Sequence, residues 1–571
     1  MNDRHRNLIL GPSTRGCVIA FTILFLSHTT AFAQQASSSA TNASNIEKQI
    51  REATPKLRKP APRTDLAPEP AISTPSVTTE LKTVLSAVVI EGATVFDPAA
   101  FGPDYEAFLA TRVSINEITL ILERITQRYR DAGYSLSRAI APPQDIDTGI
   151  LTVRVIEGYV SRVEFTGDVK DTVEFEPYGE RLTLNRPLSQ STLERYTLAI
   201  GDLSGFEVEP NLKAVNEDEG EYLLEYKLTY KPVDGVAWVN NRGTPEVGRL
   251  QSWVSAGLNS ALGERERIQL GVFTVPNEPE ESLFFELQYS QPIAYEGTAF
   301  SIGTAISTSD AGSSDAASDV ESKFERLTAA IWHPIIRSQD ESLWARATLE
   351  YRNFHENSFG RTLTNDRLRV IRGRLSYWRD GVWDGTTSAA IEISKGLDIL
   401  GESTTGSNDL SRFDGESDFT KVHFELSRDQ NLYKGFWVQA SAMGQLTNDR
   451  LLSSEEFSIG GSQFGRGYDF SEITGETGVA FSIEPRYWWN VNSDWLSGIS
   501  VYGFYDWGVV WNDILNTGKT KDSAASAGGG LRIFFPYQFK ADFEIAVPLT
   551  RPVASTGDND LRMFFALIKN Y

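Results

Sequence analysis

The chain has 571 residues, a formal net charge of −22 at pH 7 and an aromatic content of 11%. This length predicts more than one domain, and so acidic a chain is a poor binder of nucleic acid, so no nucleic-acid partner is expected. The one cysteine, Cys17, lies near the N-terminus, and a mature chain that has lost this region has no disulfide, thiolate nucleophile or cysteine metal site.

Residues 1–33 have the pattern of a secretory signal peptide. Three arginines, Arg4, Arg6 and Arg15, precede a mostly apolar run from Cys17 to Leu26. Ala31-Phe32-Ala33 then fits a cleavage site, and a buried core helix is the less favoured interpretation. Neither this run nor any later stretch reaches the ~18 apolar residues that a membrane helix needs. A membrane location would therefore require a closed β-barrel, which leaves no backbone group unpaired in lipid.

Residues 34–81 are rich in Ala, Ser, Thr and Pro, a composition that cannot bury a core and predicts a linker. One short helix is possible within it. Ser44-Asn45-Ile46-Glu47 has the pattern of a capping box, and Ile46, Ile50 and Ala53 follow at helical spacing. Pro55 is expected to end this helix early. A docked helix and a frayed, solvated segment are both open at this point.

Residues 82–158 and 159–232 predict two small α/β domains that repeat a β-α-α-β-β order. For the first we expect a short helix within Tyr105–Ala110, a longer helix capped by Ser114 and Glu117, and strands at Ser86–Ile90, Tyr134–Ala141 and Ile150–Glu157. For the second we expect a helix led by Pro187 and strands at Tyr159–Phe165, Phe206–Leu212 and Glu221–Tyr230.

Residues 233–571 predict a transmembrane antiparallel β-barrel of about 16 strands. Apolar and polar side chains alternate along segments of roughly ten residues, as in Leu283, Phe285 and Leu287 against Phe284, Glu286 and Gln288. The loops Ser309–Ser318 and Asp398–Asp418 are long and acidic, which is typical of the extracellular side, so we expect them to be exposed. The fold class is thus mainly β, with the barrel preceded by the two α/β domains.

Enzyme-like motifs in the chain are incomplete. Gly518-Lys519-Thr520 looks like the end of a phosphate loop, but Asp513 stands where the first glycine is required. Phe464 breaks the nucleophile-elbow pattern around Ser462. The histidines beyond the signal segment, His333, His355 and His423, lack the spacing of a zinc site. The sequence therefore predicts that the protein is not an enzyme and uses neither a cofactor nor a metal.

The most informative stretch lies between two predicted strands and contains Gly465-Arg466-Gly467-Tyr468. An arginine between two glycines can be presented at the tip of a tight reversal, because glycine tolerates positive φ. Counting by twos along the later strands turns six side chains into the barrel: Glu484, Arg486, Tyr502, Phe504, Asp506 and Gly508. An inward carboxylate in a confined lumen favours a cationic partner, which Arg466 could supply. A solvated lumen carboxylate and a surface-loop arginine are an equally open alternative.

Taken together, these motifs resemble those of the two-partner secretion translocators, the hemolysin secretion/activation family within the larger barrel-assembly superfamily. Further matches are Ala132-Gly133-Tyr134, Pro143-Gln144, Gly149-Ile150-Leu151 and Glu157-Gly158, which look like that family's POTRA pattern, and Asn240-Asn241-Arg242-Gly243, which looks like its first barrel hairpin. The resemblance implies an inward-folded loop near residues 447–477. It also implies a lock between this loop and the barrel, made by Arg466, Gly467, Tyr468, Glu484, Arg486, Phe504, Asp506 and Gly508.

Three positions depart from the expected pattern. Lys569 stands near the end of the barrel, where an apolar or aromatic residue is common. Gly465 stands where the family usually has valine or another larger residue, which bears on how firmly the loop tip is held. Pro55 shortens the helix that plugs the pore in the family.

The resemblance implies an outer-membrane translocator of a Gram-negative bacterium that recognises an unfolded secreted protein in the periplasm and exports it through the barrel. The α/β domains are then expected to bind the exoprotein. The other expected partners are outer-membrane lipid and the barrel assembly machinery during biogenesis. An assembly or insertion factor of the same superfamily is the alternative, whereas a diffusion porin would leave the two α/β domains unexplained.

Overall fold

The computed structural model describes residues 43–54, 83–169, 172–245, 248–311, 320–514 and 518–571. The predicted signal peptide with Cys17, most of the predicted linker and residues 312–319 of the first acidic loop lie outside the described residues. Among the residues it describes, no helix is long and apolar enough to span a membrane.

The first α/β module is a three-stranded sheet covered by one long helix. Its strand order is β2-β5-β4, with β2 (Ala87–Glu91) parallel to β5 (Ile150–Ile156) and β4 (Arg138–Ile140) antiparallel to it. A smaller pair joins β1 (Thr83–Val84) to β3 (Arg112–Val113), and α3 spans Gly102–Tyr105. The long helix α4 (Ile115–Asp131) buries Ile121, Ile125 and Tyr129. The expected capping box is present, since the Glu117 backbone amide donates to Ser114 and the Glu117 carboxylate accepts from the Ser114 amide.

Two local predictions in this module were wrong in extent. The strand expected from Tyr134 begins at Arg138, because the Ser137 amide donates to the Tyr134 carbonyl and closes a turn. The short helix expected within Tyr105–Ala110 is present as a 3-10 turn at Glu106–Phe108, but it is the last part of a longer helical run that begins at Pro98. Asp97 caps that run by accepting a hydrogen bond from the Ala99 amide at 2.9 Å. This side-chain cap determines where the helical run begins.

The second α/β module has strand order β6-β8-β7, with bounds Tyr159–Gly167, Glu221–Tyr230 and Phe206–Asn216. Two helices, α5 (Glu176–Leu184) and α6 (Gln190–Gly201), flank the sheet. The prediction that Pro187 leads the second helix was wrong, because α6 begins after Ser189, whose hydroxyl accepts from the Thr192 amide. Helix α5 takes the first helical place of the expected β-α-α-β-β order; its position was not predicted, although Pro177 in its first turn is a typical start signal.

Sixteen antiparallel strands close into one barrel, which confirms the predicted fold class. Their bounds are β9 Val233–Asn240, β10 Gln251–Asn259, β11 Arg267–Thr274, β12 Ser282–Pro292, β13 Ala299–Ala311, β14 Val320–Arg337, β15 Glu341–Ser358, β16 Arg361–Arg379, β17 Gly385–Gly396, β18 Thr420–Tyr433, β19 Phe436–Thr447, β22 Thr477–Ser493, β23 Leu496–Ile514, β24 Gly518–Phe535, β25 Phe539–Pro548 and β26 Arg562–Asn570. Each strand pairs with its neighbour in the chain, and β26 pairs with β9 to close the ring.

The predicted alternation of faces is present along the strands. Leu283 and Phe285 on β12 are exposed, while Phe284 between them is fully buried in the interior. Apolar side chains thus cover the outer face, as a lipid-facing barrel requires.

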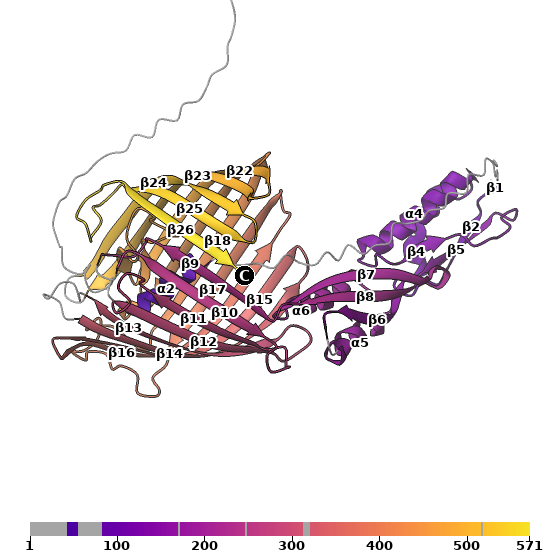
Figure 1. Cartoon of the computed structure of the whole chain (residues 1–571). Coiled ribbons are helices and arrows are strands. Elements are labelled where there is room, and N and C mark those ends of the chain that lie inside the picture. The colour runs from indigo at the N-terminus through magenta and orange to yellow at the C-terminus, as the bar shows by residue number, and fades with distance from the viewer. Residues whose placement is uncertain (1–42, 55–82, 170–171, 246–247, 312–319, 515–517) are drawn as a thin grey trace, which may run out of the picture. The chain divides into compact units, whose positions relative to one another are not determined.

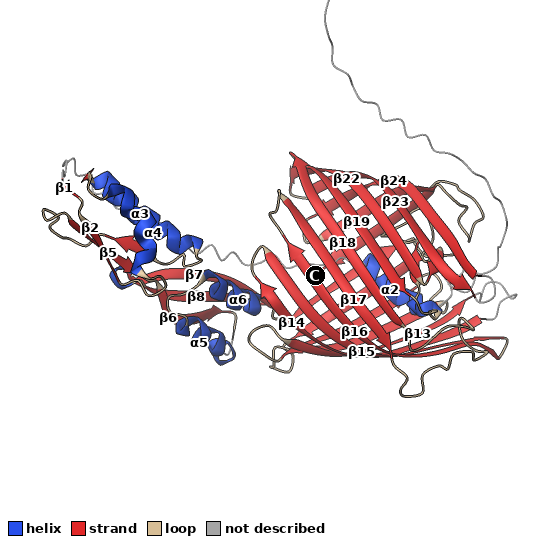
Figure 2. Ribbon diagram, turned by 180° about the vertical axis from the view of Figure 1, so that it is seen from behind, coloured by secondary structure: helices blue, strands red, loops and turns tan. Residues whose placement is uncertain are grey.

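Helix α2 (Ala43–Ala53) lies inside the ring of strands, as both views of the chain show (Figures 1 and 2). Ile46 and Ile50 are buried in one cluster with Trp238, Phe273 and Phe324 from the barrel wall. The indole of Trp238 donates to the Thr54 hydroxyl at 3.1 Å. Of the two interpretations left open by the sequence, the docked helix is therefore the one found.

The loop of residues 397–419, between β17 and β18, is only partly exposed. Leu410 and Phe419 are buried against the wall of β16. The Ser411 amide donates to Asp366 of β16 at 3.0 Å. The expectation of a fully exposed loop at Asp398–Asp418 was therefore wrong for its second half, because Leu410 within this stretch and Phe419 directly after it pack on the wall.

We predict that protease added to intact cells cuts within residues 398–408 and spares residues 83–230. Successive strands run in opposite directions, and β17 is the ninth barrel strand counted from β9. The loop after β17 therefore lies at the end of the barrel opposite to the start of β9, where the α/β modules join. Immunoblotting of the fragments measures this. Cleavage inside the modules of intact cells would contradict this topology, and cells with a permeabilised outer membrane provide the positive control.

Candidate functional site in the barrel lumen

The segment between β19 and β22, residues 448–476 and here called the inward loop, folds into the barrel. Its base is a short hairpin of β20 (Phe457–Ile459) and β21 (Ile473–Gly475). Phe457, Ile459 and Tyr468 are buried there with apolar side chains of the wall. Gly508 of β23 makes room for this packing, since a Cβ at that position would lie 2.4 Å from Ile459 Cδ1.

Two glycines shape the tip of the inward loop. Gly465 has φ +81°, a conformation that side chains rarely adopt. A Cβ on Gly467 would lie 2.9 Å from the Ser526 Cβ and 3.0 Å from a backbone atom of Val547. The glycine at position 465, which departs from the family pattern, therefore suits the backbone found here, and Gly467 allows the tip to touch the wall.

Arg466 forms a two-point ion pair with Asp506. Its Nε donates at 3.0 Å and its Nη2 at 2.9 Å to the two carboxylate oxygens, and its backbone amide donates to the same carboxylate at 3.0 Å. The Asp506 side chain is wholly buried. Burial alone would lower the pKa of Arg466, but the hydrogen bonds and charge of Asp506 raise it above its usual value. Such forked, charge-assisted bonds are strong and fix geometry.

Three further side chains complete the cage around Arg466. Glu484 accepts from Nη1 at 2.7 Å. Phe504 places its ring centroid 3.6 Å from the guanidinium carbon, within the range of a cation–π contact. Ser482 accepts from Nη2 at 3.1 Å and donates to Asp506 at 2.7 Å.

Of the other residues named in the sequence analysis, Tyr468 joins this arrangement and Arg486 does not. Tyr468 is buried, and its hydroxyl donates to the Ala525 carbonyl at 3.1 Å. Arg486 faces the lumen but pairs with Asp429 on β18. It therefore belongs to a separate contact of the wall.

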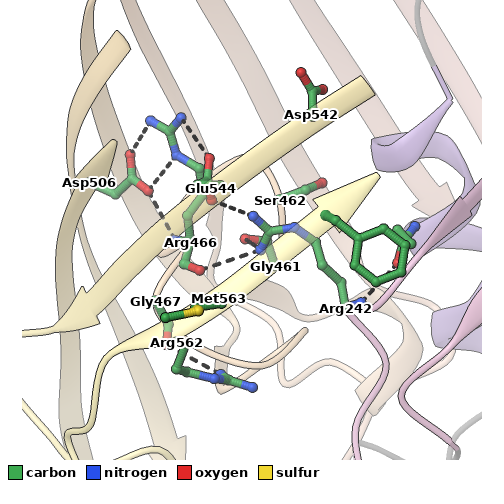
Figure 3. A network of polar contacts seen from close by, with 12 residues as sticks. Arg242, Gly461, Ser462, Arg466, Gly467, Asp506, Asp542, Glu544, Arg562 and Met563 are labelled. Atoms are coloured by element: carbon green, nitrogen blue, oxygen red, sulfur yellow. Dashed lines mark hydrogen bonds and ion pairs between the residues drawn. The ribbon is translucent and has the colours of Figure 1, made fainter. Parts of the chain in front are cut away.

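Several residues of the site were missed by sequence reasoning: Ser482, Arg532, Glu544, Arg242 and Arg562. Arg532 pairs with Glu484. Arg242 pairs with Glu544 and also donates to the Arg466 carbonyl at 3.4 Å, and Arg562 donates to the Gly467 carbonyl at 3.2 Å (Figure 3). Alternation turns most of these side chains inward, but only the closed ring shows that β9, β25 and β26 meet the loop tip.

Helix α2 is held to a different part of the wall by Glu47. Its carboxylate pairs with Arg326 of β14, and Arg352 of β15 lies 3.8 Å away. Burial alone would raise the pKa of Glu47, but Arg326, Arg51 and Arg352 together lower it to about 2. Glu47 is therefore ionised at neutral pH.

The inward loop contributes Glu455 to the same region of the wall. Glu455 pairs with Arg372 of β16 at 2.7 Å and with Lys421 of β18 at 2.8 Å. Arg352 lies 3.8 Å from Glu455 as well as from Glu47, so it lies between the helix and the loop.

The helix and the inward loop also touch each other directly through Glu52. Its carboxylate accepts from both the amide and the hydroxyl of Ser462 at 3.3 Å. Burial raises the pKa of Glu52 to about 7, although the bonds from Ser462 and the charges of Arg242 and Lys48 oppose this shift. Glu52 therefore titrates near neutral pH.

The arrangement is suited to holding two inserted elements in a pore by reversible ion pairs. In the described part of the chain no group of three or more His, Cys, Asp or Glu side chains is placed to hold a metal ion.

Comparison with known proteins identifies two matching families along the chain. Residues 226–533, more than half of the 571, match the family described as haemolysin secretion/activation protein ShlB/FhaC/HecB. Residues 83–158 match the POTRA domain of ShlB type. These matches confirm the resemblance seen in the sequence motifs.

Curated relatives cover most of the chain at low identity. The heme/hemopexin transporter protein HuxB of Haemophilus influenzae (strain 86-028NP) is 22% identical over 476 residues, which cover 81% of this chain and 82% of HuxB. The outer membrane transporter CdiB-2 of Burkholderia pseudomallei (strain 1026b) is 24% identical over 450 residues, 73% of this chain and 71% of CdiB-2.

Two solved structures share the fold. CdiB from Escherichia coli matches with a TM-score of 0.72 and 18% identity, over 95% of this chain and all of CdiB. BamA from Haemophilus ducreyi, in a form lacking POTRA domains 1–3, matches with a TM-score of 0.51 and 15% identity, over 86% of this chain and all of that one.

We predict that Arg466→Ala and Asp506→Ala each loosen the inward loop, and that the double variant adds little to either. Removing one partner of a buried ion pair leaves the other uncompensated, at a cost of about 3 kcal/mol or more. Hydrogen exchange of the amides of residues 460–470 in the full-length protein measures how much the inward loop is loosened. Arg486→Ala is the matched control, because this inward arginine pairs elsewhere. Fully additive effects would show that Arg466 and Asp506 do not act as one unit.

Proposed function

Because the chain belongs to the haemolysin secretion/activation family and is an outer-membrane translocator of two-partner secretion, we propose that α2 and the inward loop together form the closed gate of its export pore. The family translocates secreted exoproteins through barrels that follow periplasmic POTRA domains. In this chain the gate opens when α2 and the inward loop give up their ion pairs on the wall and an unfolded exoprotein takes their place.

The observation that carries this proposal is that both elements occupy the lumen and hold to it by charge. Besides the apolar packing of both elements on the wall, Glu47, Glu455 and Arg466 each reach an oppositely charged wall residue. Ion pairs exchange partners more readily than interdigitated apolar packing does, because water or other charged groups can replace each partner. Such a gate can therefore open without unfolding the barrel.

The α/β modules are proposed to capture the exoprotein by strand addition. Strands β2 and β7 each have one hydrogen-bonded neighbour within their sheets, so the other side of each strand can pair with an extended segment. Main-chain pairing of this kind needs little side-chain specificity. It suits an exoprotein that arrives unfolded.

The proposal includes the organisation and remaining partners expected from the sequence. The modules 82–158 and 159–232 act as separate units before the barrel 233–571. Outer-membrane lipid surrounds the apolar outer face, and the barrel assembly machinery inserts the chain. The family assignment favours secretion over the alternative of an assembly factor, for which the shared fold with BamA is the main argument.

The gate is tested by tethering α2 inside the barrel. The amide groups of Gln49 and Gln251 are hydrogen-bonded at 2.9 Å, and the only native cysteine is Cys17. A bismaleimide linker across the Gln49→Cys and Gln251→Cys double variant should abolish export of the exoprotein into the medium. Each single cysteine variant, treated with the same reagent, is the control and should continue to export. Undiminished export by the cross-linked protein would contradict departure of α2.

We predict that the gate opens more often as pH rises from about 5.5 to about 7.5. The pKa of Glu52 is about 7 when α2 is docked and returns toward its usual value of about 4.3 after release. The docked state thus binds a proton on Glu52 more tightly than the released state does. The protonated carboxyl group therefore favours docking at low pH, and this contribution is lost as pH rises through 7. Single-channel recording of the purified protein in planar bilayers measures the open fraction.

Two variants separate this effect from a general loosening of the gate. Glu52→Gln keeps an uncharged side chain at all pH values and should reduce the pH dependence to the part that Glu472 of the inward loop contributes, because burial raises the pKa of Glu472 to about 7 as well. Glu47→Gln on the same helix should raise the open fraction but keep the pH dependence, because the pKa of Glu47 is about 2. An unchanged pH profile in Glu52→Gln would refute the role of Glu52.

A further inference from the structure

Four cations on the inner wall form two like-charged pairs that the wall itself neutralises only in part. Arg326 of β14 and Arg352 of β15 stand directly opposite each other in the strand register. Arg372 of β16 and Lys421 of β18 flank Ser394 in one row across β17. Like charges directly opposite each other on a sheet are destabilising unless an anion lies between them. We call these four side chains the cationic patch.

Each like-charged pair is bridged by a carboxylate that comes from an inserted element. Glu47 of α2 pairs with Arg326 and lies 3.8 Å from Arg352. Glu455 of the inward loop lies 2.7 Å from Arg372 and 2.8 Å from Lys421. Helix and loop are far apart in the sequence, yet both meet this part of the wall with a glutamate.

Among the described residues, two carboxylates of the wall form ion pairs with these four cations. Glu286 pairs with Arg326 at 3.1 Å, and Glu350 pairs with Arg352 at 2.9 Å and with Arg372 at 3.3 Å. When α2 and the inward loop leave, four cations therefore face two carboxylates, a surplus of 4 − 2 = 2 positive charges. This step rests on the proposed function, in which both elements leave the lumen.

The opposite wall does not acquire a matching surplus. Glu484 keeps Arg532, and Glu544 keeps Arg242, whichever position the inward loop takes. When the inward loop leaves, Asp506 loses Arg466 and Arg562 loses Asp469, so these two losses cancel in charge. The larger uncompensated charge of the open pore therefore lies on the strands β14–β18 and is positive.

We propose that the cationic patch is a binding surface for carboxylate-rich segments of the unfolded polypeptide in transit, which occupy the places of Glu47 and Glu455. Guanidinium groups bind carboxylates through forked hydrogen bonds, and these are strengthened where water is restricted. An acidic segment thus stabilises the open pore by restoring the neutrality that the departing elements remove. It also competes with them for the same partners.

The test uses the full-length protein with Glu47→Gln, which removes the carboxylate of α2 from the patch, in planar bilayers. Unstructured Gly/Ser peptides of about 20 residues can thread a bilayer when extended, and they carry Glu, Gln or Lys at every third position. The Glu peptide should half-block the current at a concentration about tenfold lower than the Gln peptide. Adding Arg352→Gln and Arg372→Gln should abolish this difference.

Arg374→Gln is the matched control for these substitutions. Arg374 lies on the same strand and face as Arg372, but its partners Glu392 and Glu425 both belong to the wall. It should leave the preference for the Glu peptide intact, and Arg352→Lys, which keeps the charge, should retain most of it. Migration of the unheated proteins in gel electrophoresis verifies that every variant has assembled.

The outcomes separate the proposal from the function on which it rests. Equal block by the Glu and Gln peptides, or an equal loss of preference in Arg374→Gln, overturns the cationic patch while leaving the gate in place. Failure of all three peptides to block the current contradicts the route through the lumen, and with it both the proposed function and the patch.

Discussion

The pairing of charges inside a closed barrel determines how the lumen of this protein is filled. A polar interior is normal for a membrane barrel, because apolar side chains are turned to lipid. Here the interior holds a helix and a loop, so charges that water would otherwise solvate become buried. Buried charges are destabilising unless they are paired, and this requirement relates the charges on the inserted elements to those on the wall.

The pairing is arranged on two sides of the lumen with opposite sign. Strands β22 and β23 present Glu484 and Asp506 to Arg466 of the inward loop. Strands β14–β18 present cations to Glu47 and Glu455. Each inserted element therefore has a defined side of the lumen to which it is attracted. Shape refines this choice, because Gly467 lets the loop tip approach the wall closely and Gly508 makes room for Ile459 at the base of the loop.

The helix and the loop are also connected to each other, which has consequences for opening. Arg352 lies equally far from Glu47 and Glu455, and Glu52 accepts two hydrogen bonds from Ser462. Release of either element removes partners from the other, so their departures favour one another. The partly buried loop 397–419 extends this connection outward, since its Arg412 pairs with Glu476 at the end of the inward loop at 2.5 Å.

The sequence by itself determined the barrel and the repeated α/β modules, and it turned Asp506 into the lumen. It could do so because alternation with period two fixes the face of each side chain, and because capping at Ser114 acts over a few residues. The contact of Arg466 with Asp506 stayed one of two open alternatives in the sequence and was implied only by the family resemblance. Only the tertiary structure decided the rest: the docking of α2, the folding of loop 397–419 onto the wall, and the roles of Arg242, Glu544 and Arg562. The alternation of side chains along a strand predicts which of them point into the barrel. It does not predict at which height in the lumen a side chain lies or which strand it faces. Those relations arise when β26 pairs with β9 and brings residues some 320 positions apart into contact, as in the bond from the Phe565 amide to Asn241.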